Sequence, residues 1–268
     1  GARVLIGGIP APLIYVSPGQ INLVAPAVLA GLAGATTTLT VFNDRLASLP
    51  ARVAIARHAP GVFTLLGNGR GAAAMTHADY SVVSRASPLA PGEPVLLYLT
   101  GLGPLDPVVP DGAPAPSDPL ARATSSVRLL LDGIEAPVLF AGASPGFAGL
   151  HVIVATVPPS LSRRFPEVVV DVQGALSNRT SAGGPSLFDV FPSTARAGAD
   201  ATLTLRGLNF SASSAADAAG TPVPAVLTEG ELQSLTVTIP ARLLAAPGRL
   251  SLTVIDSEAP SEAPSNPV

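Results

Sequence analysis

Cysteine and tryptophan are absent from this 268-residue chain, and charged residues make up only 12% of it. Without cysteine the chain holds no disulfide framework and no thiolate metal site. The formal net charge of −3 offers no basic surface to a phosphate backbone, which argues against nucleic-acid binding. No apolar run reaches the ~18 residues that a membrane-spanning helix needs, so we expect no membrane span. No charged leader follows Gly1, so we expect any secretion signal to have been removed or to lie upstream.

Aromatic residues are scarce, whereas proline and glycine are abundant. The chain has 3 Tyr and 8 Phe against 29 Pro and 26 Gly, and 47% of its residues are hydrophobic. Its cores must therefore be built from Ala, Val and Leu. Proline and glycine follow no three-residue period, which excludes collagen, and the apolar content is too high for a disordered chain. Turn-rich all-β structure is the remaining class.

One sequence unit occurs twice. Residues 3–15, closed by Ser17-Pro18-Gly19, return as residues 128–140, closed by Ser144-Pro145-Gly146. In each copy a strand pattern, a Gly-Ile turn, an Ala-Pro start and a second strand pattern follow in one order, so the repeat indicates a supersecondary unit. Residues that both copies share are expected to serve folding and not chemistry.

A third copy is fainter. Residues 91–103 align with residues 197–209, and a strand pattern followed by Ser-Asn ends at residues 177–178 and again at residues 265–266. Nothing before Arg3 supplies the strand that opens the other two copies, so we expect the first copy to be incomplete. The last copy reaches the end of the sequence where a further strand is due.

The length fits two to three immunoglobulin-sized sandwiches of roughly 100 residues each. We therefore predict an all-β fold of tandem immunoglobulin-like β-sandwiches: a partial one over residues 1–65, a second over 66–183 and a third over 184–268. Alternating aliphatic patterns predict strands at residues 37–42, 51–56, 95–100, 127–131, 152–157, 168–173, 202–206, 235–239 and 250–255. Short helical turns are expected at residues 27–33, 160–164 and 241–246.

Four motifs carry a family resemblance: residues 11–22 (APLIYVSPGQIN), 59–63 (APGVF), 97–104 (LYLTGLGP) and 141–150 (AGASPGFAGL). Through them the first two-thirds of the chain resembles an uncharacterised C-terminal domain family of Solibacter-type acidobacteria. Residues 185–268, with Phe191-Pro192-Ser193, resemble an IPT/TIG immunoglobulin-like domain. The first family has no established activity, and its members lie at the C-terminal end of large exported proteins. The resemblance therefore implies an extracellular accessory role and assigns no catalytic residue.

Ser144 lies in the segment Gly142-Ala-Ser-Pro-Gly146, which satisfies the pattern of a hydrolase nucleophile elbow. That site needs a backbone N–H on the residue after the serine, and Pro145 has none. The same Ser-Pro-Gly occurs at Ser17 in the other copy. We therefore predict that Ser144 is a turn residue.

The other candidate residues also favour structural roles. His58, His77 and His151 lack metal-ligand spacing, although His77 lies in Thr76-His-Ala-Asp-Tyr80, where an exposed hairpin tip could contact a partner. Asp106, Asp111 and Asp118 share a Pro-rich loop without the spacing of a calcium loop, so a solvated loop is favoured over a Ca²⁺ site. Residues 67–71 (GNGRG) indicate a tight turn, and Asn178 and Asn209 are formal glycosylation sequons.

Three classes of function remain open. An enzyme needs convergent polar groups, and no motif provides them, so we assign no catalytic, cofactor-binding or metal-ligating residue and expect no cofactor. The main prediction is a non-enzymatic extracellular or cell-surface structural protein that self-associates through edge strands, as a homo-oligomer or homopolymer, into a fibre or surface layer. The alternative is a carbohydrate- or protein-binding accessory module of a larger exported protein, with possible polysaccharide or cell-surface contact.

Overall fold

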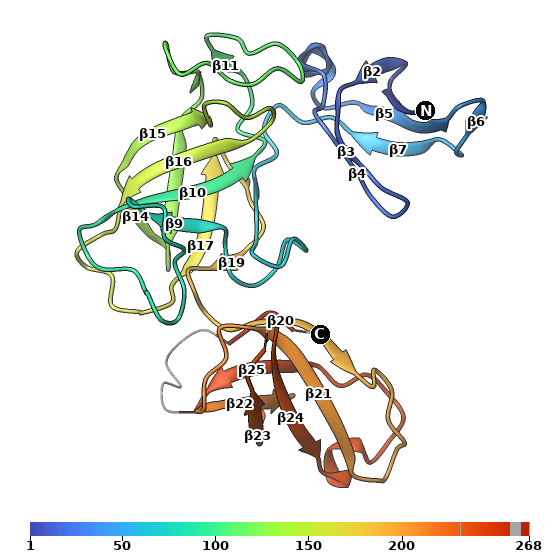
Figure 1. Cartoon of the computed structure of the whole chain (residues 1–268), viewed down its shortest axis with the longest axis vertical. Coiled ribbons are helices and arrows are strands. Elements are labelled where there is room, and N and C mark those ends of the chain that lie inside the picture. Colours follow the sequence, from blue (N-terminus) through green and yellow to red (C-terminus); the bar gives the residue numbers. More distant parts are fainter. Residues whose placement is uncertain (231, 258–263, 268) are drawn as a thin grey trace.

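The computed structural model describes residues 1–230, 232–257 and 264–267, and shows tandem immunoglobulin-like β-sandwiches. Figure 1 shows three bodies in chain order, coloured from blue through green and yellow to red. We call them the first, middle and third units. The all-β class predicted from the sequence is confirmed. Within the described residues, no helix has both the length and the apolar character needed to cross a membrane.

The first unit is the smallest. One sheet has the order β2-β1-β5-β6, with β7 also paired to β5, and a separate two-stranded sheet joins β3 to β4. The elements are β1 (Ala2–Ile6), β2 (Ile9–Ala11), β3 (Leu13–Val16), β4 (Ile21–Leu23), the 3-10 helix η1 (Ala27–Leu32), β5 (Thr36–Asn43), β6 (Leu46–Ala47) and β7 (Ala51–Ala54).

The middle unit has two larger sheets, ordered β11-β12-β15-β16-β10-β8 with β9 also on β10, and β14-β13-β17-β18 with β19 also on β17. The strands are β8 (Gly61–Val62), β9 (Met75–His77), β10 (Pro94–Thr100), β11 (Leu105–Asp106), β12 (Arg122–Ala123), β13 (Val127–Leu131), β14 (Ile134–Ala136), β15 (Val138–Ala143), β16 (His151–Thr156), β17 (Glu167–Val172), β18 (Ala175–Leu176) and β19 (Thr180–Ser181).

The third unit is a six-stranded sheet with the order β20-β21-β24-β23-β22-β25. Its elements are β20 (Ser186–Phe191), β21 (Ala201–Leu208), β22 (Ser214–Ala218), β23 (Thr221–Thr228), β24 (Gln233–Ile239), the 3-10 helix η2 (Ala241–Leu244) and β25 (Leu252–Asp256). The sequence pattern predicts that a further strand begins at Val268, and this residue lies outside the described residues.

The internal repeat is visible in the pairing. β3 pairs with β4 through a register shift between Leu13 and Tyr15, and β15 pairs with β16 through the same shift between Val138 and Phe140. The hairpin β1–β2 likewise matches β13–β14, and β1–β5 matches β13–β17. β3 and β4 are therefore the first unit's counterparts of β15 and β16.

A hydrogen-bonding pattern also recurs at the end of the middle and third units. In the middle unit, the Ser177 hydroxyl accepts a hydrogen bond from the Val170 N–H, and Asn178 exchanges two hydrogen bonds with the backbone of Val62. The third unit repeats this arrangement with Ser265 on Val254 and Asn266 on Leu187. We call this arrangement the Ser-Asn clasp. It ties the last part of a unit to that unit's opening strand.

The boundary between the first and middle units lies earlier in the chain than the expected one between residues 65 and 66. β8 pairs with β10, and Val62 packs in the middle unit's core with Leu97 and Leu99. The middle unit therefore begins before Gly61, because a strand joins the domain whose core its side chains fill. The expected strands are present, and helices form at η1 and η2, but residues 160–164 hold only a turn from Leu161 to Pro158.

Candidate functional site

Ser144 lies in a tight turn, as the sequence predicts. Its N–H donates to the Leu150 carbonyl at 2.9 Å, and its own carbonyl accepts from the Phe147 N–H at 3.2 Å. Ser17 makes the equivalent turn with Gln20 in the first unit. Pro145 follows Ser144 without an N–H, so the position has no oxyanion donor of the elbow type.

His58 and His151 meet at the backbone of one residue, which the sequence did not indicate. The Leu102 N–H donates to Nδ1 of His151 at 3.3 Å, and the Leu102 carbonyl lies 3.1 Å from Nδ1 of His58. Burial lowers the pKa of His151 to about 4. A neutral ring that accepts a backbone hydrogen bond is a structural histidine at neutral pH.

His77 does not form a group with Asp79 and Tyr80. Its Nδ1 lies 3.1 Å from a Glu93 carboxylate oxygen, while the Asp79 carboxylate turns to Ser81. Burial alone would lower the pKa of His77, but hydrogen bonds to Glu93 and Ser87 raise it above its ordinary value. Of the expected exposed group, His77 is therefore half-buried and paired with Glu93, whereas Asp79 and Tyr80 are exposed, Tyr80 at 70%.

The three loop aspartates do not converge. In the part of the chain that the structure describes, no group of three or more His, Cys, Asp or Glu side chains is placed to hold a metal ion. Asp111 instead reaches the first unit, where its Oδ1 accepts from the Ala27 N–H at 2.9 Å. Figure 1 shows the segment around β11 running toward that unit. Asp111 is therefore a contact between two units.

The remaining motifs are structural as well. The Thr64 hydroxyl accepts from the Gly69 N–H at 3.0 Å, which fixes the glycine-rich segment as a turn. Asn178 belongs to the Ser-Asn clasp, and the Asn209 amide donates to the Gly184 carbonyl at 3.2 Å. Both sequon side chains are thus engaged within the protein.

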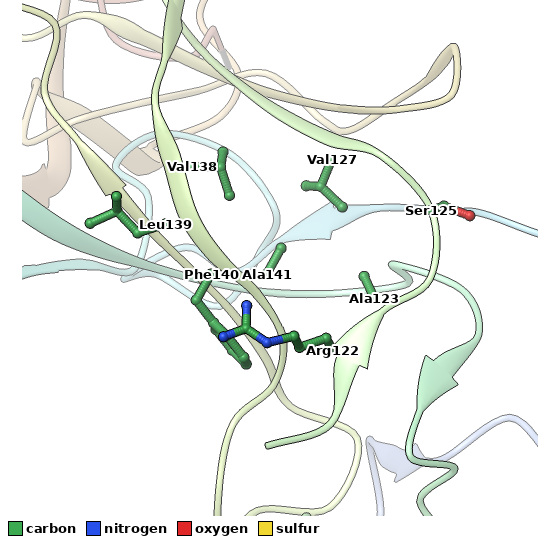
Figure 2. A pocket seen from close by; sticks show the side chains of 8 residues that line it. All are labelled: Arg122, Ala123, Ser125, Val127, Val138, Leu139, Phe140 and Ala141. Atoms are coloured by element: carbon green, nitrogen blue, oxygen red, sulfur yellow. The ribbon is translucent and has the colours of Figure 1, made fainter. Parts of the chain in front are cut away.

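A small surface pocket lies on the middle unit between β12, β13 and β15, with a volume of about 230 Å³. Figure 2 shows the Arg122 side chain lying against Phe140, and the guanidinium carbon is 4.9 Å from the ring centroid. The other lining side chains are mostly aliphatic, with Val127 and Val138 among them. This pocket has little to offer a polar ligand besides Arg122 and Ser125.

A larger groove, of about 570 Å³, lies where the middle and third units meet; we call it the junction groove. Its lining is mainly polar, and sequence analysis pointed to only one of its residues, Asn209. The lining residues are Ser84, Arg85, Ala86, Arg164, Leu208, Asn209, Phe210, Glu229, Gly230 and Gln233. They come from distant parts of the chain, so only the fold brings them together.

Contacts between the two units hold the junction groove in shape. Arg85 forms an ion pair with Asp256, whose side chain is only 6% exposed. The Asn209 carboxamide oxygen also accepts from the Arg85 N–H at 3.4 Å. Within the middle unit, Arg164 donates to the Arg85 carbonyl at 3.0 Å. Deeper in the third unit, the Ser186 hydroxyl accepts from the Ala72 N–H at 2.6 Å. The two walls of the groove are therefore fixed relative to each other.

Polar side chains of the groove contact neighbouring residues of the protein. Gln233 accepts from the Phe210 N–H at 2.7 Å and donates to the Glu229 carboxylate at 2.9 Å. The Arg164 guanidinium lies over the Phe165 ring, 5.3 Å from its centroid. Fixed donors and acceptors of this kind give orientation and specificity to a bound molecule at low entropic cost.

No family model matches the chain, and no curated protein matches it. Among solved structures it is similar to SGBP-B from a complex xyloglucan utilization locus in Bacteroides uniformis, at 18% identity and a TM-score of 0.24, over 68% of this chain and 45% of that one. It is also similar to Bacteroides ovatus SGBP-B in complex with a mixed-linkage heptasaccharide. That match has 13% identity and a TM-score of 0.23, and it covers 98% of this chain and 55% of that one.

A tandem of titin domains I9 to I11 matches at 8% identity and a TM-score of 0.19, over 97% of this chain and 84% of that one. The chain spans about half the length of the two SGBP-B structures. At these identities and scores, the likenesses concern the chain fold alone.

Proposed function

We propose that the chain is a non-catalytic, carbohydrate-binding accessory module of a larger exported protein, and that the junction groove is its binding site. The observation that carries this proposal is the groove itself. The charged residues Arg85, Arg164 and Glu229 line it, and the ion pair between Arg85 and Asp256 joins the two units that form it. Neighbouring sugar hydroxyls both donate and accept hydrogen bonds, so they complement such a mixed lining.

The chemistry of the groove also restricts how it binds. Phe210 lies in the lining but is only 3% exposed, so it offers no open ring for a sugar to stack on. Recognition would then rest on hydrogen bonds to hydroxyl groups and not on aromatic stacking. We expect weak binding of a single sugar and stronger binding of a polysaccharide that offers many repeats.

Affinity electrophoresis and calorimetry with soluble polysaccharides test the proposal, with xyloglucan and mixed-linkage glucan as the first neutral probes and a uronic-acid polymer as the acidic one. Arg164→Ala and Glu229→Ala should each weaken binding about tenfold, because each removes a charged hydrogen-bonding group. Arg122→Ala is the matched control, since Arg122 also lies over a phenylalanine but lines the other pocket. Absence of binding to every probe would contradict the proposal.

A second candidate function is self-association through β-strands into a fibre or surface layer. The observation that favours it is β4, which among the described strands pairs only with β3. A second copy could offer an edge strand such as β20, whereas a two-stranded insertion would require it to withdraw strands that already pair within its own sheets. Sedimentation velocity over a wide concentration range tests this candidate, because a polymer grows with concentration and a monomer does not.

A further inference from the structure

His77 connects β9 to the loop that forms one wall of the junction groove. Its Nδ1 lies 3.1 Å from a carboxylate oxygen of Glu93, and its Nε2 lies 3.2 Å from the Ser87 carbonyl oxygen. The Ser87 hydroxyl oxygen is also 3.1 Å from Nε2. Both nitrogens of the imidazole ring therefore face an oxygen that can accept a hydrogen bond.

Ser87 closes that loop on itself. The Ser84 N–H donates to the Ser87 carbonyl at 2.9 Å, and the Ser87 N–H donates to the Ser84 hydroxyl at 3.2 Å. We call residues 84–87 the wall loop, because three of them, Ser84, Arg85 and Ala86, line the junction groove. His77 lies outside that lining, so it acts on the groove only through the wall loop.

The wall loop is held from two sides. Toward the third unit, Arg85 forms its ion pair with Asp256, and its N–H donates to Asn209. Toward its own sheet, the Ser87 carbonyl contacts His77, which lies on β9 beside β10. Histidine is the side chain whose charge ordinarily changes near neutral pH, so the second of these contacts is the one that depends on pH.

Two carboxylates act on the His77 ring from the segments around it. Glu93 precedes β10, and Asp79 lies in the turn after β9, whereas Arg85 of the wall loop pairs with the third unit. Burial favours the neutral ring, but the hydrogen bonds to Glu93 and Ser87 and the two carboxylate charges outweigh it. The pKa of His77 is therefore raised above its ordinary value.

Protonation decides whether both contacts of the ring are hydrogen bonds. The imidazolium carries an N–H on each nitrogen, so it donates to Glu93 and to the Ser87 carbonyl at once. A neutral ring has one N–H, which stays on Nδ1 because a lone pair there would face the Glu93 carboxylate. Nε2 then presents a lone pair to the Ser87 carbonyl oxygen. The wall loop thus loses a charge-assisted hydrogen bond when the ring is deprotonated.

We propose that His77 is a pH-sensitive anchor of the junction groove: its protonated ring holds the wall loop in position for a bound polysaccharide, and its neutral ring does not. The inference rests on the proposed function only for the ligand, because the anchor can be observed in the chain alone. Polysaccharide binding should be stronger below the folded pKa of His77 and weaker above it. By reciprocity, a bound polysaccharide should raise that pKa.

NMR of the chain alone tests the anchor. The backbone amides of residues 84–87 should change their chemical shifts with pH and share the midpoint of the His77 ring. Their protection against hydrogen exchange, corrected for the exchange of an unfolded peptide at each pH, should fall about threefold across that midpoint. Glu93→Gln should move the midpoints of ring and amides together to lower pH, because it removes a charge that favours the imidazolium.

Calorimetry tests the link to the groove, with mixed-linkage glucan or xyloglucan as the probe, because these neutral polymers do not titrate. Affinity should fall about threefold between about pH 6 and 8.5, and saturation should raise the pKa of His77 by about 0.5, which is the same coupling. His77→Gln should make binding independent of pH in that range. His58→Gln is the matched control, since His58 contacts Leu102 and Ser125 outside the groove lining, and it should leave the profile unchanged.

Two results would overturn the inference. The first is a His77 ring that titrates while residues 84–87 keep both their shifts and their protection. The second is equal affinity at both ends of the pH range in a chain whose wall loop does respond. If no polysaccharide binds at any pH, the proposed function fails, whereas a wall loop that still follows the His77 ring would support the anchor.

Discussion

Val4 in the first unit and Leu129 in the middle unit hold the same place in two matching hairpins, and both are buried. The residues opposite them differ, because Val41 is half-buried while Val170 is fully buried. The hairpins are alike, so the difference arises from the neighbours. A β-sandwich closes its core through its full set of strands, and the same repeat without those strands leaves the same positions half open.

The largest effect is expected at one pair of isoleucines. Ile153→Ala should lower the free energy of unfolding of the middle unit by about 4 kcal/mol, because it leaves a cavity in a closed core. Ile21→Ala, at the matching position of the first unit, should cost only about 1 kcal/mol, because that side chain is already half exposed. Denaturant unfolding followed by unit-resolved hydrogen exchange measures both. Equal losses would show that the two cores are equally closed.

A pH dependence should follow from His151, a half-buried histidine of the middle unit. Because the folded pKa of His151 is lowered to about 4 from 6.5, the unfolded chain takes up a proton first as pH falls. The free energy of unfolding should therefore fall by about 3 kcal/mol between pH 6.5 and 4, with no further loss from this group below that range. Histidine NMR titrations and urea unfolding across that range provide the measurement.

His77 is the internal control, because its folded pKa is raised. Its contribution to stability should be fully present below pH 6.5 and should disappear as pH rises through its folded pKa. His151→Gln should remove the first dependence and leave the second. If both histidines titrate near 6.5, burial does not lower the pKa of His151 and this prediction is wrong.

The smallest effect concerns the Ser-Asn clasp. Asn178→Ala should destabilise the middle unit by about 2 kcal/mol, because it leaves the N–H and carbonyl of Val62 without these partners. Leu49→Ala, at the corresponding position of the first unit, should change stability by less than about 0.5 kcal/mol. Thermal unfolding of both variants compares the two positions. A large loss from Leu49→Ala would mean that the exposed leucine already packs against something.

The repeat pattern predicted much of this fold, because two-residue alternation and fixed turns are local signals. Strands β22 and β23 escaped that analysis: β22 is rich in alanine, and Pro222 and Pro224 interrupt the pattern of β23.

The junction groove was not predictable in the same way. Arg85, Arg164 and Glu229 lie in separate stretches without a shared motif, and only the packing of two units places them side by side. The role of Asp111 was also hidden, because its partner is a backbone N–H in another unit. Contacts of this kind produce no periodic pattern in the sequence.

Native-state hydrogen exchange at β4 and β16 tests the central claim most directly. The account predicts that the amides of residues 21–23 exchange about a hundredfold faster than those of residues 153–155, because β4 has one neighbouring strand and β16 has two. Equal protection of the two strands would contradict it.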